Sequence, residues 1–392
     1  MSQVNRMHGV TANEYTKGLR PIADVTSNII GIVAIADDAD ENVFPLDKPM
    51  FTTSVAAVID KAGKTGTLYK VLDGILDQAD ARVIVVRVSS NSEAEAQKTN
   101  VIAGVKALRK AAAVTGFRPN IIGAPELDVQ DVTTEMVAVA EALGAFVYAS
   151  CATADDLEEV KTYRKNFGSR FLMLVDGDFT SFNDADESTG KAATIGRILG
   201  ARARLDDSIG PHKSISNTEI LGVSGLSNPR SFGLLDKNSE ANTINNADVT
   251  VLIRENGYRV WGNRTCSEDP IWAFEPTVRM SNLIKETIAT SFLWAMDKPM
   301  HPSLMIDILM SINAKLSEYV AKGWLLGAEV RIDRQKVSTA RVSSGIFAFD
   351  YEFTVPPPLE NIELNQYVSD KFIVNLTDKV IEFASNMKPT TV

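Results

Sequence analysis

Strand-like and helix-like segments alternate from residue 54 to residue 178, and no other feature of the sequence limits the fold as strongly. Residues 81–88 (ARVIVVRV) form a β-branched run of strand length, and residues 28–36 (NIIGIVAIA) form a similar run upstream. Between such runs, apolar residues recur at helical spacing. Parallel strands joined by helices are covered on both faces. We therefore expect an α/β body over 28–268, built on a mostly parallel open sheet.

Two later regions depart from this alternation. Residues 206–248 are rich in Gly, Ser and Asn at turn positions and predict a loop-rich excursion from the body. Residues 303–322 then predict a helix with one apolar face, and residues 345–355 predict a strand. In that strand aromatic residues alternate with polar ones, so one face is buried and the other meets water. The aromatic positions are Phe349, Tyr351 and Phe353.

The two ends of the chain predict extended arms. Residues 1–27 are polar, with scattered apolar positions and no periodicity, so we expect an N-terminal arm outside any core. Residues 359–392 follow the stiff run Pro356–Pro358 and predict a C-terminal arm. Between the body and this arm, residues 269–358 predict a small α+β domain. Its two strands are too few for a stable sheet.

Composition excludes several classes of protein. The chain has 40 Lys+Arg and 50 Asp+Glu, a net charge of −10, which is unfavourable for binding nucleic acid. No run of about 18 apolar residues occurs, so we expect no membrane insertion. The first residues lack the apolar segment of a signal peptide, so we expect a soluble protein made in the cytoplasm. Two cysteines exclude a disulfide scaffold.

A parallel α/β sheet invites a nucleotide-binding interpretation, which the motifs do not support. Residues 63–65 read Gly-Lys-Thr, but Val58 stands where a phosphate loop needs its first glycine. The side chain of Val58 would block the approach of a phosphate to the backbone amides. No GxGxxG motif follows a predicted strand. We therefore expect no nucleotide cofactor.

Metal and nucleophile motifs fail as well. Residues 38–42 begin like a calcium-binding loop, but Val43 replaces the required glycine. The three histidines lack zinc-site spacing. Residues 222–226 approach a nucleophile elbow, with Leu226 in place of its last glycine. We expect no catalytic residue, no metal and no cofactor, and we keep an α/β enzyme or ligand-binding protein with an atypical site as the alternative.

The most distinctive text in the chain is residues 253–270 (IRENGYRVWGNRTCSEDP). It resembles the signature of contractile tail sheath proteins, which occur in myophages and in the related R-type bacteriocins. The resemblance continues in order along almost the whole chain, although no single match is a chemical motif. The further matches are 8–10 (HGV), 163–167 (YRKNF), 294–299 (WAMDKP), 312–315 (INAK), 350–361 (DYEFTVPPPLEN) and 369–371 (SDK).

This resemblance implies a structural subunit rather than an enzyme. Sheath proteins of this family polymerise helically as stacked hexameric rings around an inner tail tube, and contract to drive the tube through the target cell envelope. The expected partners are other copies of the chain, the tail tube protein, and the baseplate and tail terminator proteins. The expected location is a virion tail or a bacteriocin particle, assembled in the cytoplasm of the bacterial host. The sequence leaves open whether the particle is a phage or a headless bacteriocin.

The resemblance also implies roles for particular residues. In the family, arms of neighbouring subunits add strands to sheets, so the C-terminal α+β domain is expected to be completed by donated strands. Two lysines on the penultimate helix, Lys315 and Lys322, are expected to face the tube, with a solvated helix face as the alternative. The residues expected in intersubunit strand pairing are His8, Gly9, Val10, Phe349, Tyr351 and Phe353.

Overall fold

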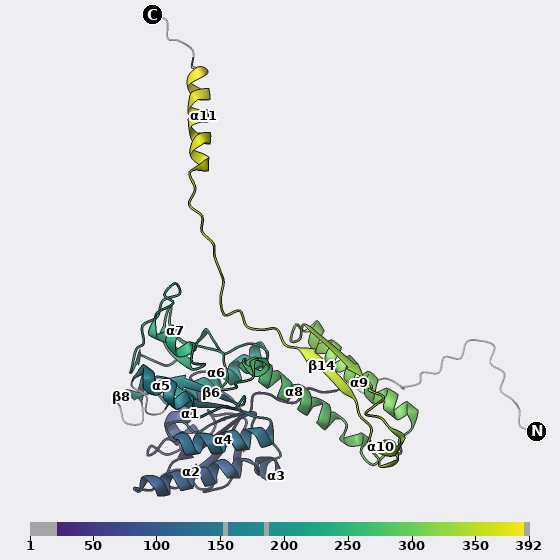
Figure 1. The fold of residues 1–392 in the computed structure, drawn as a ribbon. Coiled ribbons are helices and arrows are strands. Elements are labelled where there is room, and N and C mark those ends of the chain that lie inside the picture. The colour runs from purple at the N-terminus through teal and green to yellow at the C-terminus, as the bar shows by residue number, and fades with distance from the viewer. Residues whose placement is uncertain (1–21, 152–155, 184–187, 388–392) are drawn as a thin grey trace, which may run out of the picture. The chain divides into compact units, whose positions relative to one another are not determined.

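The computed structural model describes residues 22–151, 156–183 and 188–387, so His8, Gly9 and Val10 lie outside the described residues (Figure 1). The chain divides after Pro358 into two units. The first unit holds both hydrophobic clusters of buried residues and all the β-sheets. The second, from Leu359 on, consists of a stretch without regular secondary structure followed by helix α11 (Lys371–Ser385).

A nine-stranded sheet forms the centre of the body, and its inner strands are parallel, as predicted. The parallel strands follow the order β3-β1-β4-β5-β6-β11, with Ile30 of β1 opposite both Val83 of β3 and Ile121 of β4. These strands are almost entirely buried, which explains their continuous Val and Ile runs. Their bounds are β1 (Ile30–Ile35), β3 (Val83–Val88), β4 (Ile121–Gly123), β5 (Phe146–Ser150), β6 (Leu172–Asp176) and β11 (Thr250–Arg254).

Short antiparallel strands close both edges of this sheet. Strand β2 (Met50–Thr52) pairs with β3, and on the other side β12 (Tyr258–Trp261) joins β11 to β9 (Thr218–Glu219). Strand β9 belongs to the 206–248 excursion, so part of that segment extends the sheet. A separate three-stranded sheet holds β7 (Phe179–Asn183), β8 (Ser188–Lys191) and β10 (Gly225–Leu226).

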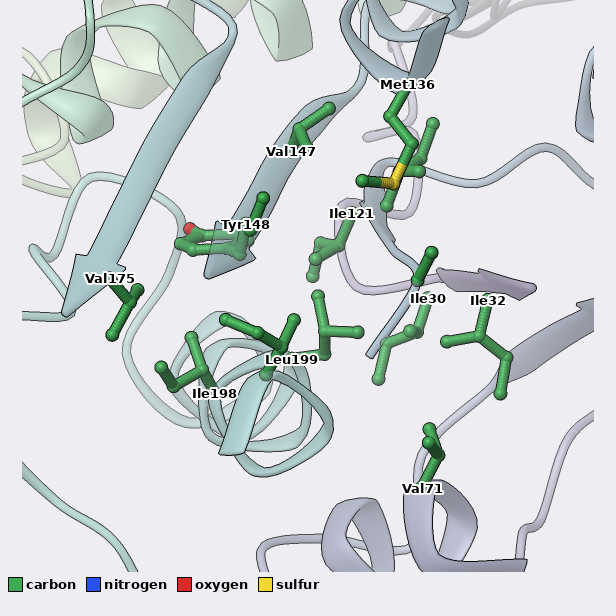
Figure 2. Packing of buried hydrophobic residues seen from close by; sticks show 14 of the residues in the cluster. Ile30, Ile32, Val71, Ile121, Met136, Val147, Tyr148, Val175, Ile198 and Leu199 are labelled. Atoms are coloured by element: carbon green, nitrogen blue, oxygen red, sulfur yellow. The ribbon is translucent and has the colours of Figure 1, made fainter. Parts of the chain in front are cut away.

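Helices cover both faces of the large sheet. Figure 2 shows Met136 of α4 on one side of the strands, and Leu199 of α6 and Val71 of α1 on the other. Gly123 in β4 allows close packing, because a Cβ there would lie 2.9 Å from a methyl of Leu199. The helices of the body are α1 (Leu68–Leu76), α2 (Ala94–Leu108), α3 (Ala111–Thr115), α4 (Gln130–Leu143), α5 (Leu157–Arg164), α6 (Thr194–Ser208) and α7 (Glu240–Asn245), with short 3-10 turns at Ile59–Lys61 and Pro270–Trp272.

Helix α8 (Glu275–Ser291) takes part in both hydrophobic clusters. Its Val278 packs in the body, whereas Met280 and Ile284, further along the helix, pack in a second cluster. The two clusters therefore meet inside α8, beyond residue 268. We call the part of the first unit built on the second cluster the C-terminal domain. It also contains a 3-10 turn at Leu293–Ala295, α9 (Pro302–Ala321), β13 (Gly327–Arg331), α10 (Thr339–Ser343) and β14 (Asp350–Thr354).

Candidate assembly site

The C-terminal domain carries a sheet of only two strands. Strands β13 and β14 pair antiparallel, with Gly327 opposite Thr354 and Arg331 opposite Asp350. Within the part of the chain that the structure describes, no third strand pairs with either of them. Each strand therefore has one side whose backbone N–H and C=O groups are not used by a sheet partner. Such an edge is a template for a further strand.

The two faces of this small sheet differ, as the alternating pattern predicts. The inner face carries Tyr351 and Phe353, half-buried side chains that pack against the second hydrophobic cluster together with Phe349, just before β14. On the outer face, Arg331 forms ion pairs with Glu329 (2.8 Å) and with Glu352. The buried face and the charged face fix the register of the strands, because a shift by one residue would exchange them.

Residues 22–27 of the expected N-terminal arm lie on this domain, and we call them the arm root. Ile22 is buried in the second hydrophobic cluster. Asp24 accepts a hydrogen bond from the Tyr319 hydroxyl (2.6 Å) and pairs with the ammonium groups of Lys315 (2.8 Å) and Lys322 (3.3 Å). Burial opposes ionisation of Asp24, but these donors outweigh it and hold the pKa of Asp24 below its usual value. The root also lines a cavity of about 430 Å³, together with the end of α8.

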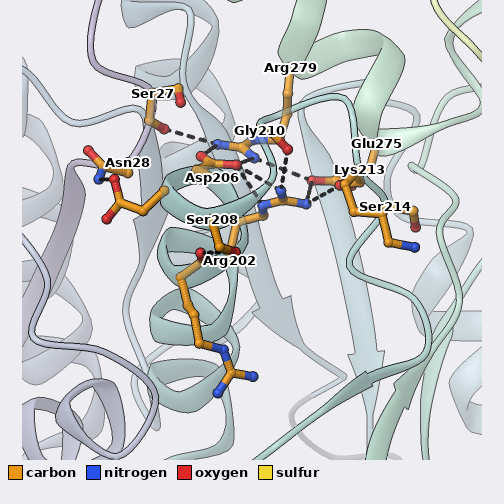
Figure 3. A network of polar contacts seen from close by, with 12 residues as sticks. Ser27, Asn28, Arg202, Asp206, Ser208, Gly210, Lys213, Ser214, Glu275 and Arg279 are labelled. Carbon is orange, nitrogen blue, oxygen red and sulfur yellow. Dashed lines mark hydrogen bonds and ion pairs between the residues drawn. The ribbon is translucent and has the colours of Figure 1, made fainter. Parts of the chain in front are cut away.

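A buried charge network joins the body to α8 (Figure 3). Asp206, at the end of α6, binds Arg202 one turn earlier (2.7 Å) and Arg279 of α8 (2.7 Å). Glu275 of α8 accepts from Arg202 (3.2 Å) and from the hydroxyl of Tyr148 in β5 (2.7 Å). Burial again opposes ionisation of Asp206, and the two guanidinium groups still lower its pKa. Each charge is paired, as a buried charge must be.

The same network reaches the arm root, and a stack of rings runs nearby. Arg279 donates to the Ser27 carbonyl (3.0 Å), so the root is fixed at its body end too. The ring of His212, from the body, stacks on Trp324 at 5.6 Å, and Trp324 stacks on Tyr319 at 5.4 Å. The Tyr319 hydroxyl is the donor to Asp24. Body, C-terminal domain and arm root are thus connected by continuous contacts.

The unit from Leu359 on has no core of its own. All of its described side chains are exposed. Helix α11 is amphipathic, yet its apolar residues Phe372 and Leu376 are 66 % and 65 % exposed. A short amphipathic helix of this kind is marginal alone in water, because helices are stabilised mainly by packing of the apolar face. The other exposed apolar side chains of this unit are Leu359, Ile362, Leu364, Tyr367, Val368, Ile373, Val380, Ile381, Phe383 and Met387.

Two carboxylates at the carboxyl edge of the large sheet are already bound by groups of the same subunit. At the carboxyl edge of the sheet, where α/β enzymes bind ligands, Asp38 accepts from the backbone amides of Lys64 (2.8 Å) and Thr65 (3.1 Å). These amides are the ones that a phosphate loop would offer to its ligand. The hydroxyl of Thr65 donates as well, and these bonds lower the pKa of Asp38. At the same edge of the sheet, Asp176 at the end of β6 is paired with Arg230 (2.9 Å).

Among residues 22–151, 156–183 and 188–387, no group of three or more His, Cys, Asp or Glu is placed to hold a metal ion. Over the same ranges, no helix has the length and apolar character needed to cross a membrane. Cys151 and Cys266 are buried, and burial raises the pKa of the Cys151 thiol well above its usual value. A thiol of that kind is a poor nucleophile.

The two lysines expected to face a tube have different surroundings. The side chain of Lys315 is 4 % exposed and its ammonium is shared between Asp24 and Glu318 (2.9 Å). The side chain of Lys322 is 40 % exposed, although it too pairs with Glu318 (2.6 Å). In this structure Lys315 therefore makes contacts inside the subunit, and of the two lysines only Lys322 is accessible at the surface. Contact of either lysine with a tube stays a prediction.

Sequence reasoning missed the residues that join the parts of the subunit. Asp24 lies in a segment without periodicity, and its partner Tyr319 is 295 positions away. Arg202 and Asp206 have the spacing of a common surface ion pair on a helix, so the pair by itself does not indicate burial. The signal that could have found them is the position of charged residues on the apolar side of α6.

Family models of tail sheath proteins match almost every part of the first unit. Residues 100–266 match the phage tail sheath protein central domain, and residues 267–369 match the phage tail sheath C-terminal domain. Residues 28–88 match the tail sheath protein Gp18 domain III N-terminal region. The three matches follow one another along the chain and leave only short segments uncovered.

Curated relatives and solved structures agree with these matches. The tail sheath protein of Escherichia phage P2 is 37 % identical over 95 % of this chain and 98 % of its own, and the major tail sheath protein of Serratia phage KSP20 is 37 % identical over 94 % and 96 %. The fold is similar to that in the contracted sheath complex of PVC, an extracellular contractile injection system (TM-score 0.71, 15 % identity, 94 % of this chain and 99 % of that chain). It is also similar to that in the contracted helical sheath of the anti-feeding prophage (TM-score 0.70, 16 % identity, 93 % and 100 %).

Sequence similarity over nearly the full length, with the same fold in solved sheaths, confirms the family expected from residues 253–270. The chain therefore belongs to the phage tail sheath protein family and is a structural subunit of a contractile sheath.

Proposed function

We propose that this subunit polymerises helically, as stacked hexameric rings around an inner tail tube, and that contraction of the polymer drives the tube through the target cell envelope. The observation that carries the proposal is the two-stranded sheet β13–β14 with its unpaired edges. Two strands alone are only marginally stable in water. A sheet of this kind becomes complete when neighbouring subunits add strands to it.

The two arms are the proposed donors of these strands. The C-terminal arm from Leu359 on carries exposed apolar side chains that find no partner within its own unit. The N-terminal arm contains His8, Gly9 and Val10, which we propose to pair with an edge of the sheet of a neighbour. On the receiving side, Phe349, Tyr351 and Phe353 hold the sheet against the second hydrophobic cluster. Head-to-tail contacts close into a ring when the rotation between subunits closes, and otherwise extend into an open helix, so such contacts between stacked rings build a helical polymer.

Contraction in this proposal is a rigid-body movement of subunits. The buried network of Asp206, Arg202 and Arg279 supports it, because body and α8 are joined by paired charges without access to water. Arms that stay paired would keep the lattice connected while the bodies rotate and slide into new contacts. The free energy of contraction would come from those new contacts between subunits. No nucleotide is required, and we propose that the chain has no enzymatic activity.

The proposed partners are the tail tube protein, the baseplate and tail terminator proteins, and further copies of the chain. Similarity to chains in the baseplate structures of the anti-feeding prophage supports a baseplate contact. Lys322, whose side chain is 40 % exposed, is the lysine we propose to face the tube. The proposed location is a virion tail or a bacteriocin particle, assembled in the cytoplasm of the bacterial host.

Negative-stain electron microscopy of the purified full-length chain tests this function directly. The protein would be concentrated without nucleotide or metal, alone and with a matching tube protein as template. We expect hollow tubes with regular striations and six-fold end views. Small closed oligomers under both conditions would contradict the proposal and favour an α/β protein with another role.

A further inference from the structure

We infer that Asp24 is a positioning residue for assembly, because it fixes the arm root to the C-terminal domain of its own subunit. The arm then ends at residue 21 rather than at residue 27, and Ile22 is the residue at which it joins the domain. This inference rests on the proposed function, since it concerns the arm that donates a strand. Strand donation alone does not specify which residue fixes the arm to its own subunit, and the inference assigns that role to Asp24.

The arm root is held at several points along its six residues. Ile22 fills a place in the second hydrophobic cluster. Asp24 binds three donors from α9 and the residue after it, and the amide of Val25 donates to the Thr287 hydroxyl of α8 (3.5 Å). The carbonyl of Ser27 accepts from Arg279 (3.0 Å), also on α8. The root therefore contacts both α8 and α9, and these contacts fix the course of its backbone.

Asp24 is the contact in this set that carries charge from the root. Its carboxylate accepts from Tyr319, Lys315 and Lys322 together, and charge-assisted hydrogen bonds are about twice as strong as neutral ones. Replacing the carboxylate with a neutral amide removes the charge that pairs with both ammonium groups, and leaves Lys315, which is 4 % exposed, with Glu318 as its remaining carboxylate partner. The contact of Ile22 with the second hydrophobic cluster is apolar, and an apolar contact does not fix the direction of the chain.

Fixing the root shortens the free arm. An extended chain spans at most about 3.5 Å per residue. Release of residues 22–27 would add about 20 Å of slack. Slack lowers the effective concentration of the arm at the edge of a neighbouring sheet. A fixed root therefore favours the polymer without adding a contact between subunits.

The test compares Asp24→Asn with the matched control Glu318→Gln. Both remove one carboxylate from the same two lysines, but only Asp24 belongs to the root. Hydrogen exchange of the full-length monomer measures the protection of the arm root, through the peptide that contains the Val25 amide. Pelleting over a range of protein concentrations reports assembly, with or without tube template as the wild type requires. Tyr319→Phe, which removes one donor to Asp24 and keeps the ring, serves if Asp24→Asn does not fold.

We expect faster exchange at residues 22–27 in Asp24→Asn. We also expect a rise of about twofold in the concentration at which half the protein pellets, because the linker after residues 8–10 lengthens from residues 11–21 to residues 11–27. Glu318→Gln should change neither. Unchanged hydrogen exchange at residues 22–27 in Asp24→Asn would show that Asp24 does not fix the arm root. Faster exchange with normal pelleting would overturn the positioning role. A chain lacking residues 1–21 separates this failure from failure of the proposed function: if it pellets like the wild type, strand donation itself is wrong.

Discussion

The two sheets of the first unit differ in how they end. The nine-stranded sheet of the body finishes in very short strands, three residues in β2 and two in β9. The sheet of the C-terminal domain has two strands of five residues each, and both are edge strands. Short edge strands discourage pairing between molecules, and longer unpaired ones invite it. We call the body sheet, whose edges are protected by short strands, the closed sheet, and the two-stranded sheet, whose edge strands lack a further partner among the described residues, the open sheet.

This difference assigns separate tasks to the two regions. The body buries nearly all of its sheet within the subunit, so its stability needs no neighbour. The C-terminal domain keeps its aromatic face half-buried on a small cluster, so it gains most from additional strands. The two regions are joined by contacts through Asp206 and through His212.

Deleting residues 1–21 should give the largest effect, and it addresses only the open sheet. We expect complete loss of pelleting polymers, because the edge of each neighbouring sheet loses its donated strand. The melting temperature of the monomer should remain near that of the wild type, since the arm root from Ile22 on is kept. Electron microscopy and differential scanning calorimetry measure the two quantities. Normal tubes from the shortened chain would mean that the open edges are completed in another way.

Asp206→Ala should break the joint between the two regions. The change leaves Arg202 and Arg279 buried with Glu275 as their remaining carboxylate, and breaking a buried ion pair costs about 3–5 kcal/mol. Urea unfolding followed by circular dichroism measures this loss. The control Asp131→Asn removes a carboxylate that pairs with Lys98 at the surface, and it should leave the midpoint unchanged. Equal midpoints for the two variants would show that the network does not hold the regions together.

Much of this architecture could be predicted from sequence, because the patterns involved are local. The parallel sheet follows from buried β-branched runs such as Val83–Val88, and the aromatic face from the period of two at Tyr351 and Phe353. The phosphate-loop interpretation could be rejected from Val58 alone. The structure adds that Asp38 already binds the amides in question.

The arm root could not be predicted, because its contacts join distant parts of the chain. Lys315 shows the problem most clearly. On a helix with charged neighbours it appeared to be a surface residue, but its partner Asp24 comes from the other end of the sequence and buries it. A polar segment without periodicity gives no sign that one carboxylate within it is fixed. Periodicity detects faces of helices and strands, and it does not detect a single ion pair between them.

Phe353→Ala should have a smaller effect on the monomer than loss of Asp206. The side chain is half-buried, so we expect a loss of about 2–3 kcal/mol, below the usual cost of truncating a fully buried Phe. Urea unfolding of the monomer measures it. Glu352→Gln, one position away on the outer face, should leave the midpoint unchanged. If both variants unfold at the same urea concentration as the wild type, the aromatic face does not support the open sheet.

The smallest effect concerns the ring stack between the regions. Burial, and then the nearby cations Arg202 and Lys213, lower the pKa of His212, while Asp206 acts in the opposite direction. A histidine with a lowered pKa contributes stability above its ordinary value near 6.5, and loses it as the pH falls through its pKa in the folded protein. The contact of His212 with Trp324 should therefore weaken between pH 7 and pH 5.

The matched variant for this prediction is His212→Phe, which keeps a ring on Trp324 and cannot be protonated. The wild type alone is not decisive, because burial raises the pKa of Asp128 to about 6, and this group favours the folded state towards acid pH. The two proteins share Asp128, so the difference between their unfolding midpoints isolates His212. We expect the wild type to lose stability relative to His212→Phe from pH 7 to pH 5. A constant difference would mean that the stack does not sense pH, and that the charge network alone couples the closed sheet to the open one.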